Sequence, residues 1–346
     1  MVGLTAVPTR LLLQPCRMAI ADGQRQLNQA QAESSTGRRA DPGLMLGSQT
    51  GDVITLRTEI TSLSQSKAAG EQAMIAAGLT QDALSALNSV AERFRSDLTG
   101  ARSAGNGPSI SASIALSSLG ALDDKLIATH DGNFLFGGLA SGSRPLNRYE
   151  DGPRQAIRDS FVTTFGFPPE DPAAANLSSD QVLDYIGGAF KSLFTDPGWS
   201  SVWSNASAET GKLRLGYDSS VIVSSTAHAP FARKLAEAFA LVELVGSSKI
   251  NAAAFSAATE KALVLSSEAQ AEIASEQTGI GVGQSRVREI MLTMERRRET
   301  LSSAVSALEG VDPYEAATRV NLLMTQLEAS YALTGRISRM NLLSYL

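Results

Sequence analysis

The sequence is poor in the residues that most often build metal-binding or redox sites. Among 346 residues there is one cysteine, Cys16, and there are two histidines, His130 and His228. A single cysteine excludes an internal disulfide framework and a multi-cysteine metal centre. The histidines are far apart and neither has a second histidine at helical ligand spacing, so no histidine-based zinc site is expected.

Charge of one sign and long hydrophobic runs are also scarce. Charged residues make up 19% of the chain and the net charge is −5, which argues against nucleic-acid binding. No run reaches the ~18 consecutive apolar residues that a membrane span needs. The first twenty residues hold only a short apolar stretch, broken by Arg10, Pro15 and Arg17, and lack a small-residue cleavage site. We therefore expect no membrane span, cleaved signal peptide or lipid anchor.

Aromatic residues are only 5% of the chain although apolar residues are 43%, a balance that favours helix. Apolar and small residues recur every seventh position in both halves of the sequence, as in helices that pack side by side. In the first half this seam consists of Leu56, Leu63, Gly70, Ala77, Leu84, Ala91 and Leu98. In the second half it consists of Ile273, Ile280, Val287, Met294, Leu301 and Leu308. Breakers at 103–109 and 311–313 should end these helices, and a shorter helix is expected over 110–128.

Both ends of the chain also read as helices with an apolar stripe. Pro15 is interpreted as the first turn of the N-terminal helix, and Asp312 with Pro313 as the N-cap and first residue of the C-terminal one. The residues predicted to form an assembly interface are Leu13, Ile20, Leu27, Val320, Leu323, Leu327, Tyr331, Ile337, Met340, Leu342, Leu343 and Leu346. A single helix can bury only part of this surface, so each arm should be marginal until other chains cover it.

The middle of the chain has a different composition. Nine of the eleven phenylalanines and both tryptophans lie between residues 134 and 239. Alternating β-branched residues over 212–225 predict a strand pair with its turn at 216–219. Amphipathic helices are expected over 178–194 and 230–245. The predicted fold is therefore mainly α: a long antiparallel, coiled-coil-like rod built from both termini, with an inserted compact α/β middle domain.

Motifs for catalysis are weak. No phosphate-loop spacing occurs, and the glycines of 279–283 lack both a preceding strand and the dinucleotide-binding spacing. The adjacent acids Asp123 and Asp124 and the basic run at 296–298 are interpreted as solvated helix faces. The sequence indicates no enzyme, cofactor or metal, although an active site within the middle domain stays open as a minor alternative.

Four segments resemble the flagellin superfamily. The ending "LEASYALTGRISRMNLLSYL" (327–346) is similar to the C-terminal signature of that family, and "SSTGRRADPG" (34–43) resembles the turn after its first helix. The stretch "GVGQSRVREI" (281–290) resembles part of the returning helix. The segment "GNFLFGGLASGSRPL" (132–146) resembles a motif of the hook-associated proteins that join hook to filament. The stretch after Arg39 is shorter in this sequence than in the family pattern.

The resemblance implies a structural flagellar subunit with three regions. These are terminal assembly arms at 1–48 and 312–346, a helical rod at 49–140 and 246–311, and an outward-facing variable domain at 141–245. It also implies export through the flagellar channel without a cleaved signal, to an extracellular place in the flagellum. The implied partners are further copies in a ring, a neighbouring hook-associated protein, flagellin, and an export chaperone on the C-terminal arm.

Two other functions are compatible with the sequence. One is a filament flagellin rather than a junction subunit. The other is a secreted membrane-active or adhesive protein, which would need a Lys/Arg-rich polar face on its amphipathic ends. The last arm carries Arg319, Arg336 and Arg339 against Glu315 and Glu328, a balance that disfavours the membrane-active reading.

Overall fold

The computed structural model describes residues 9–41, 47–102, 107–215 and 219–339, and the side chains of 9–13, 48, 219 and 337–339 lie outside this description. The α-helices are α1 (Thr9–Thr36), α3 (Thr50–Ala101), α4 (Gly107–Leu126), α5 (Pro153–Phe165), α6 (Ser179–Tyr185), α7 (Pro230–Ser247), α8 (Ala252–Glu309) and α9 (Pro313–Arg339). Short 3-10 turns are η1 (Gly47–Gln49), η2 (Gly138–Ala140), η3 (Tyr149–Asp151) and η4 (Pro172–Asn176), and π-helical turns are η5 (Ile186–Phe190) and η6 (Trp199–Trp203). The strands are β1 (Thr129–His130), β2 (Asn133–Phe134), β3 (Leu213–Leu215) and β4 (Ser219–Val221), in two antiparallel pairs, β1–β2 and β3–β4.

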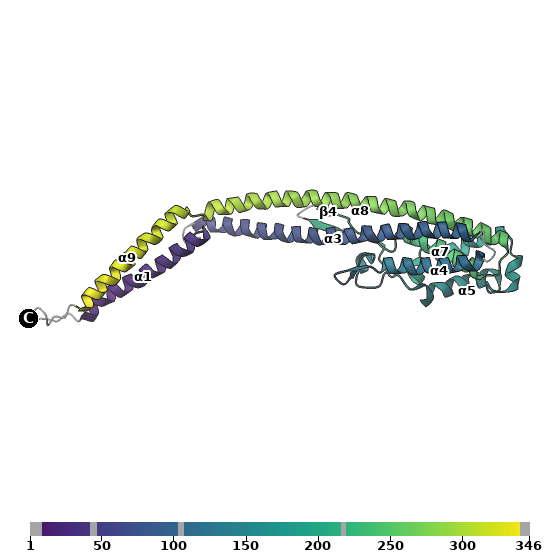
Figure 1. Ribbon diagram of the computed structural model, residues 1–346, viewed down its shortest axis with the longest axis horizontal. Coiled ribbons are helices and arrows are strands. Elements are labelled where there is room, and N and C mark those ends of the chain that lie inside the picture. Colours follow the sequence, from purple (N-terminus) through teal and green to yellow (C-terminus); the bar gives the residue numbers. More distant parts are fainter. Residues whose placement is uncertain (1–8, 42–46, 103–106, 216–218, 340–346) are drawn as a thin grey trace, which may run out of the picture. The chain divides into compact units, whose positions relative to one another are not determined.

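The chain divides into two compact units, and each is built around an antiparallel helical pair (Figure 1). The first unit joins Met1–Gln65 to Met294–Leu346, and the second is Ser66–Thr293. In the second unit, Arg95 donates to Gln270 at 2.7 Å and Gln81 donates to the Gln277 carbonyl at 2.7 Å. Residue numbers rise along α3 as they fall along α8, which makes the pair antiparallel.

The seven-residue seams lie inside this pair, as predicted. Within the second unit, Ala77, Leu84, Ala91 and Leu98 of α3 and Ile273, Ile280 and Val287 of α8 are all buried. The breaks after Ala101 and after Glu309 also fall where glycine, proline and aspartate predicted them. The mainly α fold with long helices from both ends is confirmed.

The start of the first helix differs from the prediction. Pro15 lies inside α1, which begins at Thr9, so the interpretation of Pro15 as its first turn is wrong. Proline removes one backbone donor and crowds the preceding turn, yet the helix can continue on both sides of that single lost bond. The Pro15 side chain is exposed, so no neighbouring element has to accommodate the ring.

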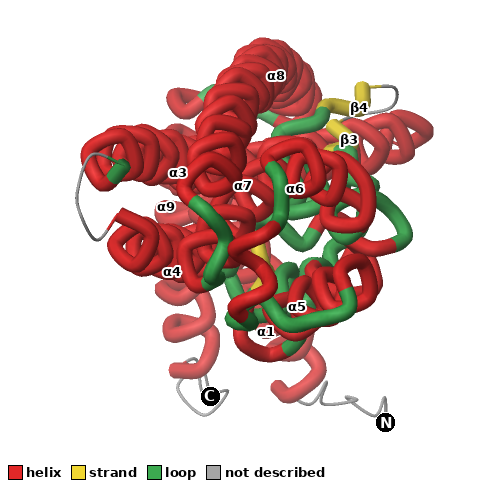
Figure 2. The backbone as a smooth tube through the Cα atoms, turned by 90° about the vertical axis from the view of Figure 1, so that its right-hand side faces the viewer, coloured by secondary structure: helices red, strands yellow, loops and turns green. Residues whose placement is uncertain are grey.

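The core of the second unit surrounds α7. Fourteen of its eighteen residues are buried, and α4 approaches so closely that a Cβ on Gly246 would lie 2.5 Å from the Pro108 carbonyl oxygen. Phe239 of α7 packs on Phe94 of α3 with ring centroids 4.6 Å apart, and the stacked indoles of Trp199 and Trp203 fill another side of the core. Seen end on, α7 lies among the other helices of the unit (Figure 2).

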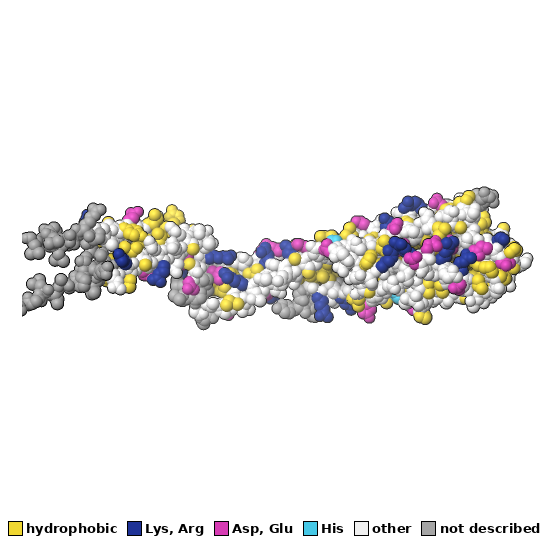
Figure 3. Space-filling view, turned by 90° about the horizontal axis from the view of Figure 1, so that it is seen from below, with side chains coloured by type: hydrophobic (Ala, Val, Ile, Leu, Met, Phe, Trp, Pro, Cys, Tyr) yellow, Lys and Arg dark blue, Asp and Glu magenta, His cyan; other side chains and the backbone are white. Residues whose placement is uncertain are grey.

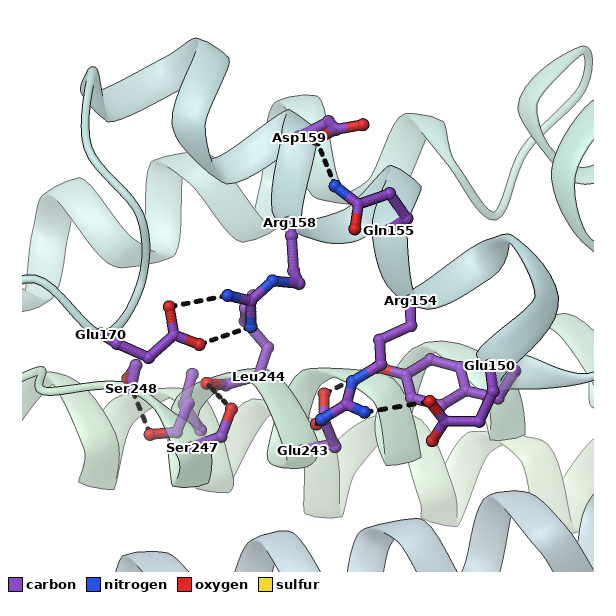
Figure 4. Close-up of polar contacts among 12 residues, drawn as sticks. Glu150, Arg154, Gln155, Arg158, Asp159, Glu170, Glu243, Leu244, Ser247 and Ser248 are labelled. Carbon is purple, nitrogen blue, oxygen red and sulfur yellow. Dashed lines mark hydrogen bonds and ion pairs between the residues drawn. The ribbon is translucent and has the colours of Figure 1, made fainter.

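Two acidic residues are buried in α7, and one of them is fully partnered. Glu243 accepts hydrogen bonds from the Tyr149 hydroxyl at 2.7 Å and from Arg154 at 3.1 Å (Figure 4). Burial, with the nearby Glu243 carboxylate, raises the pKa of Tyr149 far above its usual range, so the phenol stays a donor. Arg158 and Glu170 form a second, bidentate pair beside it. The Arg154–Glu243 contact fastens α5 to α7, and the Arg158–Glu170 pair joins α5 to the loop that follows it.

Candidate assembly interface

The terminal helices α1 and α9 form an antiparallel pair with a narrow core (Figure 1). Leu327 packs over Gly23, where a Cβ would lie 3.5 Å from the leucine side chain. Gln24 donates to the Tyr331 hydroxyl at 2.5 Å, and Arg319 pairs with Glu33 at 3.4 Å. Among the described side chains of the pair, the buried apolar residues are Ala30, Ala316, Leu323 and Leu327. A two-helix pair with so few buried side chains is a marginal structure by itself.

A backbone contact, here termed the clamp and formed by residues 37–39 and 309–311, closes the inner end of this pair. The Arg39 N–H donates to the Glu309 carbonyl at 2.9 Å, and the Val311 N–H donates to the Gly37 carbonyl at 3.1 Å. Gly37 has φ +67°, a conformation that favours glycine. The predicted cap is also present, because Asp312 accepts from the Tyr314 N–H at 2.8 Å at the start of α9.

Ion pairs reinforce the clamp. The Glu309 side chain is only 1% exposed and pairs with Arg57, which is 51% exposed. Glu33 accepts from the Ala40 N–H at 3.0 Å with one oxygen and faces Arg319 with the other. Because removing a partner would leave a buried carboxylate unpaired, these contacts fix the turn between α1 and the residues that follow it.

Most of the predicted interface residues whose side chains are described lie along the contact between α1 and α9, here called the seam. Leu323 and Leu327 are buried, Ile20, Leu27 and Val320 are half-buried, and Tyr331 is half exposed at its edge. The side chains of Leu13 and Ile337, and the whole of Met340, Leu342, Leu343 and Leu346, lie outside the described residues. The seam therefore uses several predicted residues within one chain, and their role between chains stays a prediction.

The sequence reasoning missed most of a second set of apolar residues on these helices and predicted only Tyr331 among them. The exposed large side chains are Met18 on α1 and Tyr314, Leu322, Met324, Tyr331 and Leu333 on α9. Leu322 and Leu333 are 59% and 56% exposed and lie three helical turns apart on one flank of α9. Met324 and Tyr331 lie on its other flank. A search for apolar residues eleven positions apart would have found Leu322 and Leu333, whereas a search for a seven-residue repeat does not detect them.

Grooves run along both flanks of the seam. One is lined by Leu27, Met324, Leu327 and Tyr331 with polar residues around them, and the other by Ala19, Gly23, Leu323 and Ala329. Hydrophobic side chains gather on this surface in Figure 3. The exposed side chains and open grooves together show that one copy of the chain leaves much of the apolar surface of its arms uncovered.

Among the described residues no group of three His, Cys, Asp or Glu side chains is placed to hold a metal ion. None of the helices, searched over the same residues, is long and apolar enough to cross a membrane.

A fold in which both chain ends pair as helices and leave apolar flanks uncovered defines a helical subunit of a larger assembly. Two family profiles match this chain: the bacterial flagellin N-terminal helical region at residues 9–141, and the bacterial flagellin C-terminal helical region at residues 264–346. The chain belongs to the flagellin superfamily and is a structural subunit of the bacterial flagellum, an extracellular assembly. A search of curated proteins finds no match.

Proposed function

We propose that the chain is the junction subunit between hook and filament, equivalent to hook-associated protein 3. The observation that carries the assembly role is the uncovered apolar surface on both flanks of α9. A surface of this kind on a helix that is marginal alone is expected to be covered by further copies. In this proposal the arms at 1–48 and 312–346 form the inner layer, the helices at 49–140 and 246–311 form the rod, and 141–245 faces outward.

The segment at 132–146 resembles a motif of hook-associated proteins, and in this proposal it contacts a neighbouring subunit. Phe136 is fully buried and packs on Phe231 with ring centroids 6.4 Å apart, which fixes the segment to the core. Gly138 has φ +62°, and a Cβ there would lie 2.7 Å from the carbonyl oxygens of Ser207 and Glu209. This rigid turn presents Leu139, which is exposed. An anchored turn with an outward apolar side chain suits contact with a different neighbouring subunit.

The partners follow from the same proposal. Further copies would complete a ring, a second hook-associated protein would lie on the hook side, and flagellin would lie on the filament side. An export chaperone would cover the C-terminal arm before secretion, since that arm carries the apolar flanks. Secretion without a cleaved signal belongs to this proposal as well.

Electron microscopy of cells that lack this chain tests the assignment. We expect complete hooks without filaments, with flagellin released into the medium. Complementation with an epitope inserted in the outward region, followed by immunogold labelling, should mark only the filament base. Label along the whole filament would instead identify a filament flagellin and overturn the junction assignment.

Amide hydrogen exchange tests the proposed role of the arms. Residues 1–45 and 312–346 are expected to exchange fast in the dilute monomer and slowly in the assembled flagellum, because neighbouring copies would cover the flanks of α9. The buried helix α7 serves as the internal reference and should be protected in both samples. Equally slow exchange of the arms in dilute monomer would contradict the proposal.

A further inference from the structure

Two of the described methionines are exposed, and both lie on the terminal helices. Met18 of α1 is 63% exposed and Met324 of α9 is 45% exposed. Elsewhere in the described chain, Met294 is buried and Met74 and Met291 are half-buried. Protein cores normally use methionine as a flexible side chain that fills gaps. A methionine thioether in contact with water is instead open to chemical attack.

Met324 lies in a groove of the arm pair, whereas Met18 does not. The groove on one flank of the seam has Leu27, Met324, Leu327 and Tyr331 among its lining residues. Leu327 is buried and Tyr331 is 50% exposed, so Met324 and Tyr331 supply much of the open apolar surface of this groove. Met18 is absent from the lining of this groove and from that of the groove on the other flank. A second copy that covers this flank of α9 must therefore cover the Met324 thioether.

Peroxides convert an exposed methionine to its sulfoxide. The sulfur lone pair attacks one oxygen of hydrogen peroxide, the O–O bond breaks, and that oxygen stays on the sulfur. Sulfur loses two electrons, and the peroxide is reduced to water. The product is a polar side chain in place of an apolar one. Covering the thioether is favourable, whereas covering a sulfoxide oxygen that finds no hydrogen-bond donor costs free energy.

We propose that Met324 is an oxidation site that controls whether this flank of α9 can be covered. The thioether permits contact with the next copy, and the sulfoxide prevents it. The inference rests on the proposed assembly role of the arms, and it adds the reactive residue and the class of its reagent, a peroxide. The site is open only before assembly, because a covering copy would exclude the oxidant. A sulfoxide at Met18 would leave both grooves unchanged.

The first test measures the oxidation rate at each methionine by mass spectrometry, in the purified full-length chain and in intact flagella, after treatment with hydrogen peroxide. In the monomer, Met324 and Met18 should react at least about tenfold faster than the buried Met294. In flagella, the rate at Met324 should fall by at least about tenfold. If the arms exchange amide hydrogen slowly in flagella but Met324 still reacts at the monomer rate, this inference is wrong. Fast amide exchange of the arms in flagella would contradict the proposed function instead.

The second test uses substitutions that copy or prevent the change in polarity. Met324→Gln places a polar side chain in the groove, and Met324→Leu keeps an apolar one that cannot form a sulfoxide. Met18→Gln is the matched control, because it makes the same change outside both grooves. The amount of chain in sheared flagellar fractions should fall by about tenfold for Met324→Gln and stay unchanged for the other two variants. Glutamine, leucine and methionine have similar helix propensity, so loss of α9 would not explain the fall. Normal incorporation of Met324→Gln, or equal loss for Met18→Gln, would overturn the proposal.

A pulse of hydrogen peroxide during the regrowth of sheared flagella tests the sulfoxide itself. At the same dose, cells with Met324→Leu should incorporate at least about threefold more chain than cells with the unaltered chain. Comparing the strains removes the effects of peroxide on other proteins, and Met18→Leu should behave like the unaltered chain. Equal sensitivity of Met324→Leu and the unaltered chain would show that another residue is the target and would refute the assignment of Met324.

Discussion

Replacing Leu327 with aspartate is expected to remove the chain from flagella. Leu327 is the buried residue that packs over Gly23 and lines both grooves of the arm pair. The substitution loses a buried leucine and places an unpaired carboxylate in the seam, a change that costs about 3–5 kcal/mol. Because the described part of the arm pair buries few other apolar residues, this cost should exceed what the pair can sustain, and α1 should separate from α9.

The measurement is the amount of chain in sheared flagellar fractions, with swimming as a second readout. We expect a fall of more than about tenfold and loss of motility. Leu183→Asp is the matched control, since it makes the same chemical change at an exposed position of α6 in the other unit. The tryptophan fluorescence of Trp199 and Trp203 should be native in both variants. Normal incorporation of Leu327→Asp would show that assembly does not depend on the seam.

The second large effect is a loss of stability of Ser66–Thr293 as the pH rises from about 4.5 to about 7, caused by Glu237. Burial in α7 raises the pKa of Glu237 from 4.5 to about 7. Lys191, Lys261 and Lys234 oppose this rise in pKa and Glu268 adds to it, but desolvation is the largest cause. The side chain is only 6% exposed, so solvent does little to relieve the cost of its charge.

The direction of the effect follows from proton binding. Below pH 4.5 the carboxyl group is neutral in both the folded and the unfolded chain, and the folded state bears no penalty. As the pH rises to 7 the unfolded chain ionises freely while the folded chain holds its proton, so stability falls by about 3 kcal/mol. Asp196, whose pKa Ser200 and Arg233 lower to about 2, acts in a different window, where stability falls as the pH drops below about 4.

Urea unfolding followed by the fluorescence of Trp199 and Trp203 at pH 5 and pH 8 measures this effect. Glu237→Gln should remove most of the pH dependence and make the second unit about 3 kcal/mol more stable at pH 8. Glu260→Gln, at an exposed position of α8, should retain the dependence of the unaltered chain. A Glu237→Gln variant with the original pH dependence would show that another group is responsible.

The long helices were predictable because each packs against one partner along one face, and this face appears in the sequence as a regular apolar repeat. Gly70, Ala77 and Leu84 recur at seven residues and are buried along α3. Glycine, proline and aspartate at 103–109 and 311–313 act locally, so the helix ends also follow from the sequence. The β3–β4 pair was predicted from alternating β-branched residues over 212–225. Of the turn predicted at 216–219, Ser219 begins β4, and 216–218 lie outside the described residues.

The features that the sequence did not predict are those set by tertiary packing, that is, by how many other elements surround a residue and how closely they approach it. The acids Glu237 and Glu243 mark the polar face of an amphipathic helix in the sequence, but α7 is surrounded and both are buried. The sequence analysis considered Gly283 only as part of a glycine spacing that does not fit dinucleotide binding, because the close approach of the Ile222 carbonyl leaves no trace in the local periodicity. On the two apolar flanks of α9, Leu322, Met324 and Leu333 were missed, because the sequence analysis looked for a single apolar stripe on this helix.

The clamp shortens the effective loop that must close before the two arms can pair. Gln24 and Tyr331 are in contact although 307 positions separate them. Closing a free loop of that length costs conformational entropy that grows with the logarithm of its length. Once residues 37–39 and 309–311 are bonded, only the few dozen residues between the clamp and this contact still have to be ordered. Pairing of α1 with α9 can then start at the clamp and proceed outward along both helices. Although these helices are far apart in sequence, they pair as readily as the two helices of a helical hairpin.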